Sequence, residues 1–234
     1  MPREENIADF ALEAIIQSQH ECNYSSQLNT LLDTCELLQE RIPGYRVKIG
    51  FGLHAGWAVE GALGSKHKID CTYLGPHQDM SERLETATKL YGTPVLTTDS
   101  FYVLLSAQRQ RTMRIVDRVL CEKLGPKGAS VAVTLYAVAP GHDEHHFHEP
   151  KINTYSCQCE VGMKAYIDGE WARAAAVLRP LLLQMPEDRP VQLILGYMQL
   201  FGEGKGAGMR APSTWQGYRE TVGEHLEPPY NVDV

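Results

Sequence analysis

The chain has 234 residues, of which 43% are hydrophobic and 22% are charged, as in an ordinary folded protein with room for one large or two small domains. Its 22 basic and 29 acidic residues give a formal charge of -7 without a lysine or arginine cluster, which argues against nucleic-acid binding. The sequence shows no signal peptide, no transmembrane run and no C-x-x-C pair among its six cysteines. We therefore expect a reducing, cytoplasmic location, for a separate protein or for the cytoplasmic part of a larger membrane protein.

Two helices are predicted before the first strand, at residues 7–18 and 28–38, because apolar side chains recur there with helical spacing. Each apolar face is expected to join the core. The polar segment 23–26 between them is either a break or a turn within one long helical region, and the sequence does not decide between these. Pro43 and Gly44 then lead the chain into a strand.

The stretch from Val47 to Gly92 carries the strongest signals. Residues 47–53 alternate between apolar and polar, and the run 57–63 follows a turn at Ala55 and Gly56, so an antiparallel hairpin of these two segments is predicted. Five glycines punctuate it. They indicate either tight bending and close strand packing or the close approach of a ligand to the backbone, and both interpretations stay open.

A third strand is predicted at residues 69–74, followed by a short loop and a helix up to Tyr91. Asp79 is expected to be the N-cap of this helix and Gly92 its C-terminal stop. A strand, a short loop and a helix N-terminus together form a place where a phosphate is favoured. Asp79 and Arg83, four residues apart, also fit a purely structural cap and ion pair.

After Gly92 the pattern predicts a strand at 94–97, a helix at 101–105 and an antiparallel hairpin of segments 113–120 and 131–138. The sequence GPKG at residues 125–128 lies between the last two strands. It is interpreted as a turn and not as a phosphate loop, because no helix follows and the G-x-x-x-x-G-K-[ST] spacing is missing.

A polar, histidine-rich linker is predicted at residues 140–150, dividing a first domain (1–139) from a helical tail (151–234). Its four histidines could bind a transition metal or simply be solvated; they are His142, His145, His146 and His148. Helices are expected at 159–166, 172–185 and 191–201. The first two resemble one tetratricopeptide-type unit, which must dock on another surface because it cannot bury its own apolar face. Trp171 and Trp215 are interpreted as packing anchors.

The central motifs resemble the second half of a class III adenylate/guanylate cyclase catalytic domain. FGLHAGWAVEGALGS, at residues 51–65, is similar to that family's glycine-punctuated hairpin, and DCTYLGPHQDMSERLE, at 70–85, to the segment Y-[TD]-x-x-G-x-x-V-N-x-A-x-R-[LM]-E. The similarity extends over residues 7–138. The helical tail, with its closing WQGYR at 215–219, is similar to the tail of long protist cyclases.

This resemblance implies three site residues. Thr72 takes the place of the residue that selects the base, and Arg83 that of the arginine that steadies the transition-state phosphate. Asp79 stands where the family has an asparagine that positions the ribose. The last is a departure, because a carboxylate accepts hydrogen bonds but donates none and repels a triphosphate.

The resemblance also implies a fold and a cofactor: an incomplete ferredoxin-like α+β sandwich with an antiparallel sheet, using Mg²⁺ or Mn²⁺. In the family, two metal-binding aspartates and a base-recognising lysine stand on strands that precede the helix at residues 7–18. Only residues 1–6 precede that helix in this sequence, so these family residues find no counterpart there. Asp9, Asp33 and Asp70 are available carboxylates, but Asp9 and Asp33 lie in helical patterns and not on the strand ends that the family uses. The implied substrates are ATP or GTP, turned over at the interface with another cyclase domain in a homo- or heterodimer.

Three interpretations remain open. The chain is a piece of a longer cyclase, a non-catalytic partner that lends Arg83 to a complete cyclase domain, or an interaction scaffold that keeps the fold without the chemistry.

Overall fold

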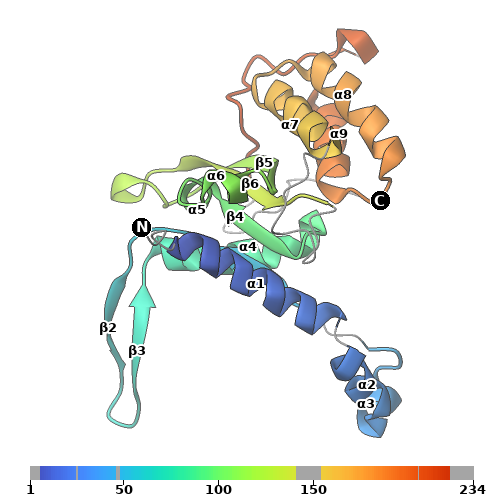
Figure 1. The fold of residues 1–234 in the computed structure, drawn as a ribbon. Helices are drawn as coiled ribbons and strands as arrows, with labels where there is room; N and C mark the ends of the chain where they lie inside the picture. The colour runs from blue at the N-terminus through green and yellow to red at the C-terminus, as the bar shows by residue number, and fades with distance from the viewer. Residues whose placement is uncertain (1–5, 25, 46–47, 141–153, 205, 222–234) are drawn as a thin grey trace, which may run out of the picture.

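The computed structural model describes residues 6–24, 26–45, 48–140, 154–204 and 206–221. Its centre is a four-stranded sheet in the order β1-β4-β6-β5, and a two-stranded ribbon and two groups of helices extend from it (Figure 1). The four strands are β1 (Phe51–Leu53), β4 (Val95–Thr98), β6 (Val131–Val138) and β5 (Met113–Cys121). β1 is parallel to β4, and the other two pairings are antiparallel, so the prediction of a mostly antiparallel α+β fold is confirmed.

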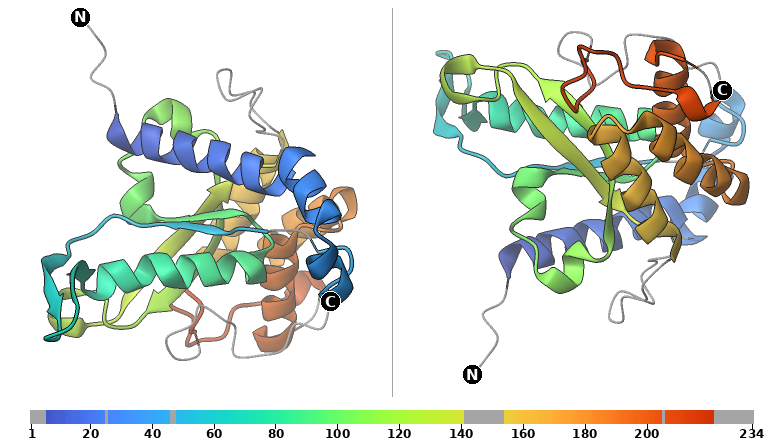
Figure 2. Two further views of the ribbon diagram at one scale, coloured as in Figure 1. Left: turned by 90° about the horizontal axis from the view of Figure 1, so that it is seen from below. Right: turned by 90° about the horizontal axis from the view of Figure 1, so that it is seen from above.

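Helices cover both faces of this sheet (Figure 2). α1 (Ile7–Tyr24) packs on one face, where its Leu12 and Ile16 meet Val95. α4 (Pro76–Tyr91) packs on the other face, where its Leu84 meets Leu96. The neighbouring strand residues Val95 and Leu96 thus point to opposite cores, as the two-residue period of a strand requires.

The predicted pairing of the first two strands is wrong. β2 (Val59–Gly64) pairs with β3 (Ile69–Leu74) in a separate antiparallel ribbon, and β1 joins the main sheet beside β4. Gly52 shows why β1 stays there: a Cβ on it would lie 2.3 Å from the carbonyl oxygen of Ser81. β1 therefore lies directly against α4, and for this glycine the close-packing interpretation holds.

The helix predicted at 28–38 is two helices in the structure, α2 (Ser26–Thr34) and α3 (Glu36–Arg41), with Cys35 as the N-cap of the second. They extend away from the sheet beyond the end of α1 (Figure 1). Leu31 and Leu37 are 66% and 72% exposed, so the expectation that this segment forms part of the core is wrong. The apolar spacing alone did not specify a partner for that face.

α4 begins four residues earlier than predicted, with Gly75 as N-cap and Pro76 in its first turn, so Asp79 is not the cap. Proline is well tolerated there because the first helical amides have no intrahelical acceptor. Gly92 ends the helix at φ 60°, as predicted.

The expected 101–105 helix is α5 (Asp99–Tyr102), and a second short helix, α6 (Ala107–Gln110), was not predicted.

Three helices form the predicted tail: α7 (Thr154–Ile167), α8 (Trp171–Gln184) and α9 (Arg189–Phe201). α7 packs against α8 around the fully buried Trp171, whose Nε1 donates to the Tyr166 carbonyl oxygen at 3.1 Å. Trp215 donates to the Ile167 carbonyl oxygen at 3.1 Å, so both tryptophans act as packing anchors. A tetratricopeptide-type identity for this pair stays a prediction.

Two buried ion pairs join the tail to β5. Arg114 contacts Asp188 with two nitrogens, Nη1 at 2.6 Å and Nη2 at 3.2 Å. Arg219 contacts Asp117 through Nε at 3.0 Å and Nη2 at 2.8 Å, and its Nη2 also reaches the Tyr91 hydroxyl at 2.9 Å. Tyr91 is the last residue of α4. The tail is therefore docked on the first domain, as its apolar faces required.

Candidate functional site

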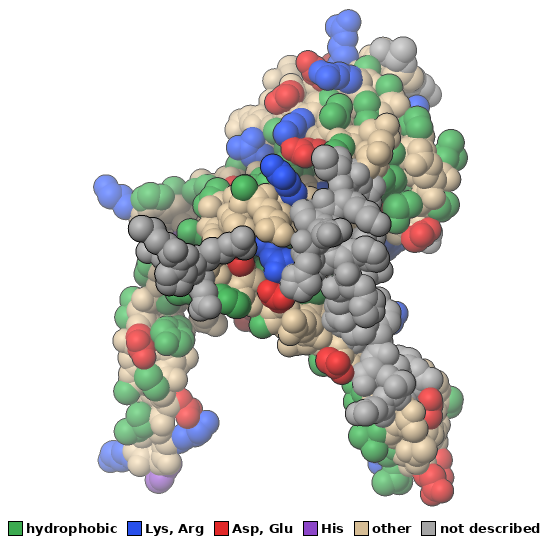
Figure 3. Space-filling view, viewed as in Figure 1, with side chains coloured by type: hydrophobic (Ala, Val, Ile, Leu, Met, Phe, Trp, Pro, Cys, Tyr) green, Lys and Arg blue, Asp and Glu red, His purple; other side chains and the backbone are tan. Residues whose placement is uncertain are grey.

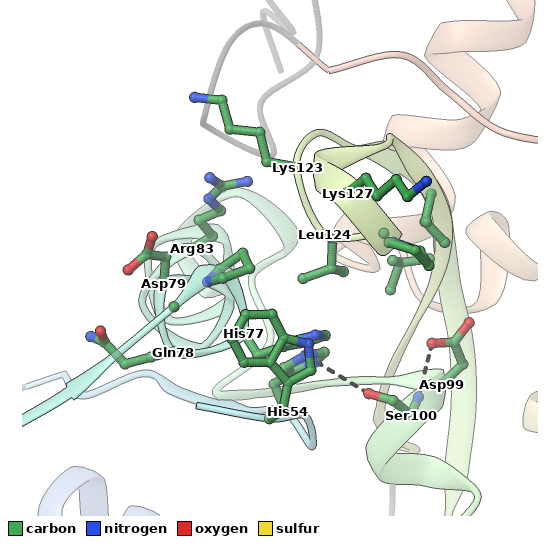
Figure 4. A pocket seen from close by; sticks show the side chains of 18 of the residues that line it. His54, His77, Gln78, Asp79, Arg83, Asp99, Ser100, Lys123, Leu124 and Lys127 are labelled. Carbon is green, nitrogen blue, oxygen red and sulfur yellow. Dashed lines mark hydrogen bonds between the residues drawn. The ribbon is translucent and has the colours of Figure 1, made fainter. Parts of the chain in front are cut away.

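A cleft of about 1100 Å³ lies between the N-terminal half of α4 and the turn that joins β5 to β6. Figure 4 shows Arg83, Asp79 and His77 on one side of it and Lys123, Leu124 and Lys127 on the other. Asp99 and Ser100, from the start of α5, lie at a third side. The cleft thus brings together residues as distant in the sequence as His54 and Val133.

Cations border the cleft from both sides. Arg83 is half-buried about two turns into α4, and Lys123 and Lys127 belong to the β5–β6 turn. Both lysines have left-handed backbone conformations, with φ of 62° and 57°, which is uncommon for residues other than glycine. Such conformations persist where the surrounding structure fixes them. The turn therefore places Lys123 and Lys127 at the same cleft that Arg83 lines, an arrangement suited to a polyanion.

Two of the three predicted site residues line this cleft, namely Asp79 and Arg83. Asp79 is exposed in the first turn of α4, where its charge is favoured by the helix dipole. Among the described residues no ion pair joins Asp79 to Arg83, so the structural alternative of a cap with an ion pair does not hold. Arg83 instead lies close enough to Cys121 to oppose, in part, the burial that raises the pKa of that thiol to about 12.

Thr72 does not line the cleft. It lies on β3 opposite Gly61, in the ribbon that extends from the body of the molecule (Figure 1). Its hydroxyl donates weakly to the Tyr73 carbonyl oxygen at 3.5 Å. Because side chains alternate along a strand, Thr72 shares a face with Leu74, which does line the cleft. Thr72 therefore lies just outside the cleft, next to Leu74 on the same face of β3.

A histidine pair connects β1 to the start of α4. His54 Nε2 lies 2.8 Å from His77 Nδ1, and the two rings are nearly parallel at 5.1 Å. The Nδ1 atom of His54 lies 2.8 Å from Thr98 Oγ1 and 3.2 Å from Ser100 Oγ. Burial, with a smaller contribution from His77, lowers the pKa of His54 to about 4. His54 is therefore neutral near pH 7.

Sequence reasoning gave no site role to most residues of the cleft, among them His54, Trp57, His77, Lys123 and Lys127. Periodicity placed His54 on the polar face of a strand and Trp57 at the start of another, and GPKG was interpreted only as a turn. The turn is confirmed, as a 3₁₀ segment at Pro126–Gly128. A signal for His54 existed, because it lies inside the glycine-punctuated motif.

The carboxylates of the described residues do not gather with other ligand side chains into a group of three or more. No group of three or more His, Cys, Asp or Glu side chains in the described ranges could hold a metal ion. Asp99, the other carboxylate of the cleft besides Asp79, accepts from the Ser100 amide at 2.8 Å and the Thr134 amide at 3.2 Å. Asp9 accepts from the Ser106 amide at 2.9 Å, and Asp70 pairs with Lys68 at 2.8 Å. The linker histidines 142, 145, 146 and 148 lie outside the described residues.

The six cysteines are all unpaired thiols. None of the helices within the described ranges combines the length and the apolar character needed to cross a bilayer.

Comparison with known proteins relates the chain to adenylate cyclases. It is 32% identical over 93 residues to an adenylate cyclase of Anabaena cylindrica, an alignment that covers 40% of this chain and 18% of the relative. It is 29% identical over 126 residues to adenylate cyclase 1 of Rhizobium meliloti (strain 1021), covering 52% of this chain and 17% of the relative. The chain thus matches less than a fifth of the length of each relative. No protein-family model matches it.

Two solved structures of a bacterial light-regulated adenylyl cyclase align with 61% and 58% of the chain and with 36% and 35% of their own chains. Both alignments have a TM-score of 0.41, at 22% and 23% sequence identity.

Proposed function

We propose that this chain is part of a class III nucleotidyl cyclase, which converts ATP or GTP to a cyclic nucleotide and pyrophosphate. In this proposal it contributes the transition-state arginine, Arg83, to a site shared with another cyclase domain. The observation that carries the proposal is the cleft that Arg83, Lys123 and Lys127 line together. Three cations around one cleft suit the charge of a nucleoside triphosphate.

The proposed roles follow from side-chain chemistry. Arg83 presents a fork of N–H donors to the phosphate at which charge develops during the reaction. Thr72 contacts an edge of the base, since its hydroxyl can both donate and accept. Asp79 stands at the ribose position without the donor that an asparagine amide would supply. Binding and charge stabilisation are thus assigned to this chain.

The metal ions are assigned to the partner domain, because the described residues of this chain do not fit them. The chemistry that Mg²⁺ or Mn²⁺ would supply, when bound by the partner domain, is stabilisation of negative charge on the phosphates. On this chain, the corresponding task is to hold the triphosphate with Arg83 and the two lysines.

The β2–β3 ribbon supports the proposed partner. Apolar side chains on it are unusually exposed, and Figure 3 shows hydrophobic groups along its length. They include Val59 at 59%, Leu63 at 58%, Ile69 at 72% and Tyr73 at 57%. An exposed apolar surface of this kind marks an interaction site more often than a solvated face. We assign it to the second cyclase domain, as a homodimer or a heterodimer, in the cytoplasm, where the six free thiols would stay reduced.

The test is cyclic-nucleotide production from ATP and from GTP with Mg²⁺ or Mn²⁺. The chain is assayed alone and mixed with a complete cyclase domain whose own transition-state arginine has been replaced. We expect turnover only in the mixture, and we expect Arg83→Ala to abolish it. Arg173→Ala, which changes an arginine 64% exposed on α8, is the matched control and should leave turnover intact.

A second candidate function is a non-catalytic pseudo-cyclase or interaction scaffold. Asp79 favours it, because a carboxylate replaces the amide expected beside the ribose and opposes a polyphosphate. A folded chain that associates with the complete domain but restores no turnover would support this alternative over the first proposal.

A further inference from the structure

Trp57 forms an exposed aromatic wall at the mouth of the cleft. Its side chain is 59% exposed, although tryptophan is one of the largest apolar side chains. It lies in the loop between β1 and β2 and meets the His77 ring edge to face at 5.6 Å, with an interplanar angle of 70°. Gly75 lies directly beside the indole, since a Cβ at that position would be in ordinary contact with Trp57 Cζ3 at 3.5 Å.

The wall is fixed in place before any ligand arrives. His77 is held by His54 at 2.8 Å, and His54 is held in turn by Thr98 at 2.8 Å. Gly56, next to Trp57, makes this packing possible, because a Cβ on it would lie 2.3 Å from the His77 ring. A rigid aromatic surface loses little conformational freedom when a flat group stacks on it.

The cleft therefore has two chemically different parts. Trp57, His77 and Leu74 provide an aromatic and apolar part, and Arg83, Lys123 and Lys127 provide a cationic part. A ligand that is flat and unsaturated at one end and multiply anionic at the other matches both. At about 1100 Å³ the cleft is also large enough for a nucleoside triphosphate.

We propose that the nucleobase of the substrate stacks on Trp57 beside His77, with its edge directed outward toward Thr72. This proposal rests on the proposed function and adds a position for the base. Thr72 lies on the same face of β3 as Leu74, so a base against this wall has Thr72 at its outer side. Stacking fixes the plane of the ring, whereas Thr72 contacts its polar edge.

Intrinsic fluorescence and calorimetry test the stacking directly. The probes are ATP, GTP and inorganic tripolyphosphate, which has the charge but no base. We expect ATP and GTP to quench Trp57, because Trp171 is fully buried and Trp215 is half-buried in the tail. Trp57→Ala should weaken ATP binding by about 5- to 150-fold, the range typical of base–aromatic stacking, and leave tripolyphosphate binding unchanged.

Two variants control this experiment. Trp57→Phe keeps an aromatic surface and should retain most of the affinity. Phe10→Ala removes an aromatic side chain that is 52% exposed on α1, outside the cleft, and should leave ATP and tripolyphosphate binding unchanged. Equal loss of ATP and tripolyphosphate binding in Trp57→Ala would overturn the stacking and indicate a disturbed cleft.

The mixture with a complete cyclase domain separates the two proposals. Trp57→Ala should raise KM for ATP and leave kcat nearly unchanged, whereas Arg83→Ala should lower kcat. Turnover with an unaltered KM in Trp57→Ala would overturn the stacking and leave the proposed function standing. Absence of turnover with the unmodified chain would overturn the proposed function itself.

Discussion

Asp79 is the residue at which this chain departs from the pattern it otherwise resembles. Its carboxylate lines the same cleft as Arg83. Replacing it by asparagine removes a negative charge and adds two N–H donors, so Asp79→Asn should tighten ATP binding by roughly five- to tenfold. Calorimetry in low salt measures this. The control is Glu82→Gln, the same change of charge at an exposed position on α4. Asp99→Asn would not serve as a control, because both carboxylate oxygens of Asp99 accept hydrogen bonds from backbone amides.

If Asp79→Asn weakened binding, the carboxylate would have a positive role, such as holding a cation with the phosphate. A gain in affinity together with turnover in the mixture would show that the other cleft residues remain competent.

The His54–His77 contact predicts a pH dependence of stability. His54 has an ordinary pKa of 6.5 when unfolded and about 4 when folded. Between these values the unfolded state binds a proton that the folded state does not, so the free energy of unfolding falls as the pH drops from 6.5 to 4. Urea unfolding at pH 7 and pH 4.5 should show a loss roughly 1 to 2 kcal/mol larger than in His54→Gln, allowing for solvent screening. An identical pH dependence in both proteins would contradict this origin.

The sequence identified residues where a motif gave them a role, and missed residues whose role comes only from folding. Asp79 and Arg83, which line the cleft, were named because they match positions of the family motif. His77 and Lys127 were not, because the contact of His77 with His54 spans 23 residues and Lys127 lies in a turn whose function depends on what faces it. Short-range patterns carry no information about such long-range neighbours.

At the level of elements, β5 holds the molecule together through Asp117. This carboxylate is fully buried, and it accepts from Tyr91 on α4 at 2.6 Å and from Arg219 on the tail at 2.8 Å. Although burial opposes it, the Asp117 carboxylate keeps the pKa of the Arg219 guanidinium above its ordinary value. One strand residue thus connects the helix that carries Arg83 to the last described segment.

Arg219→Ala should lower the free energy of unfolding by roughly 3 to 5 kcal/mol, because it leaves the Asp117 charge buried without its cation. Urea denaturation followed by circular dichroism measures the loss. Arg173→Ala, at an exposed pair with Glu170, should cost less than about 1 kcal/mol. Replacing both charges, as in Asp117→Leu with Arg219→Met, should recover much of the loss. A small effect of Arg219→Ala would mean that the tail is undocked in solution.

The elements themselves were predictable wherever periodicity was strong, but their partners were not. The strand at 69–74 and the pairing of β5 with β6 are confirmed. The predicted partner of β2 was wrong, because alternation shows that a segment is extended but does not show which strand lies beside it. Gly52 allows β1 to pack closely against α4, because a Cβ on it would lie 2.3 Å from the carbonyl oxygen of Ser81. Only the fold reveals this close approach.

At the scale of the whole molecule, the ribbon and the α2–α3 helices extend from the body like two arms (Figure 1). The ribbon is the arm to which we assign the partner domain. Leu63→Lys should therefore weaken association with a complete cyclase domain by at least about tenfold, since a charge at an apolar contact is costly to desolvate. Analytical ultracentrifugation of the mixture measures this.

Leu183→Lys provides the matched control for Leu63→Lys. Leu183 is 84% exposed on α8, in the tail, so the same substitution there should leave the association unchanged. Equal weakening by both substitutions would indicate a general effect of charge. No effect of either would move the interface away from the ribbon.

The Asp117–Arg219 contact also sets an order in time. The two residues are 102 positions apart, and ribosomes add about 5 to 20 residues each second, so Arg219 is made about 5 to 20 seconds after Asp117. During that interval the nascent sheet carries an acidic group that has no cation to meet it. We therefore expect a nascent chain to remain loosely packed around β5, exposed to chaperones, until Arg219 has been made and reaches Asp117.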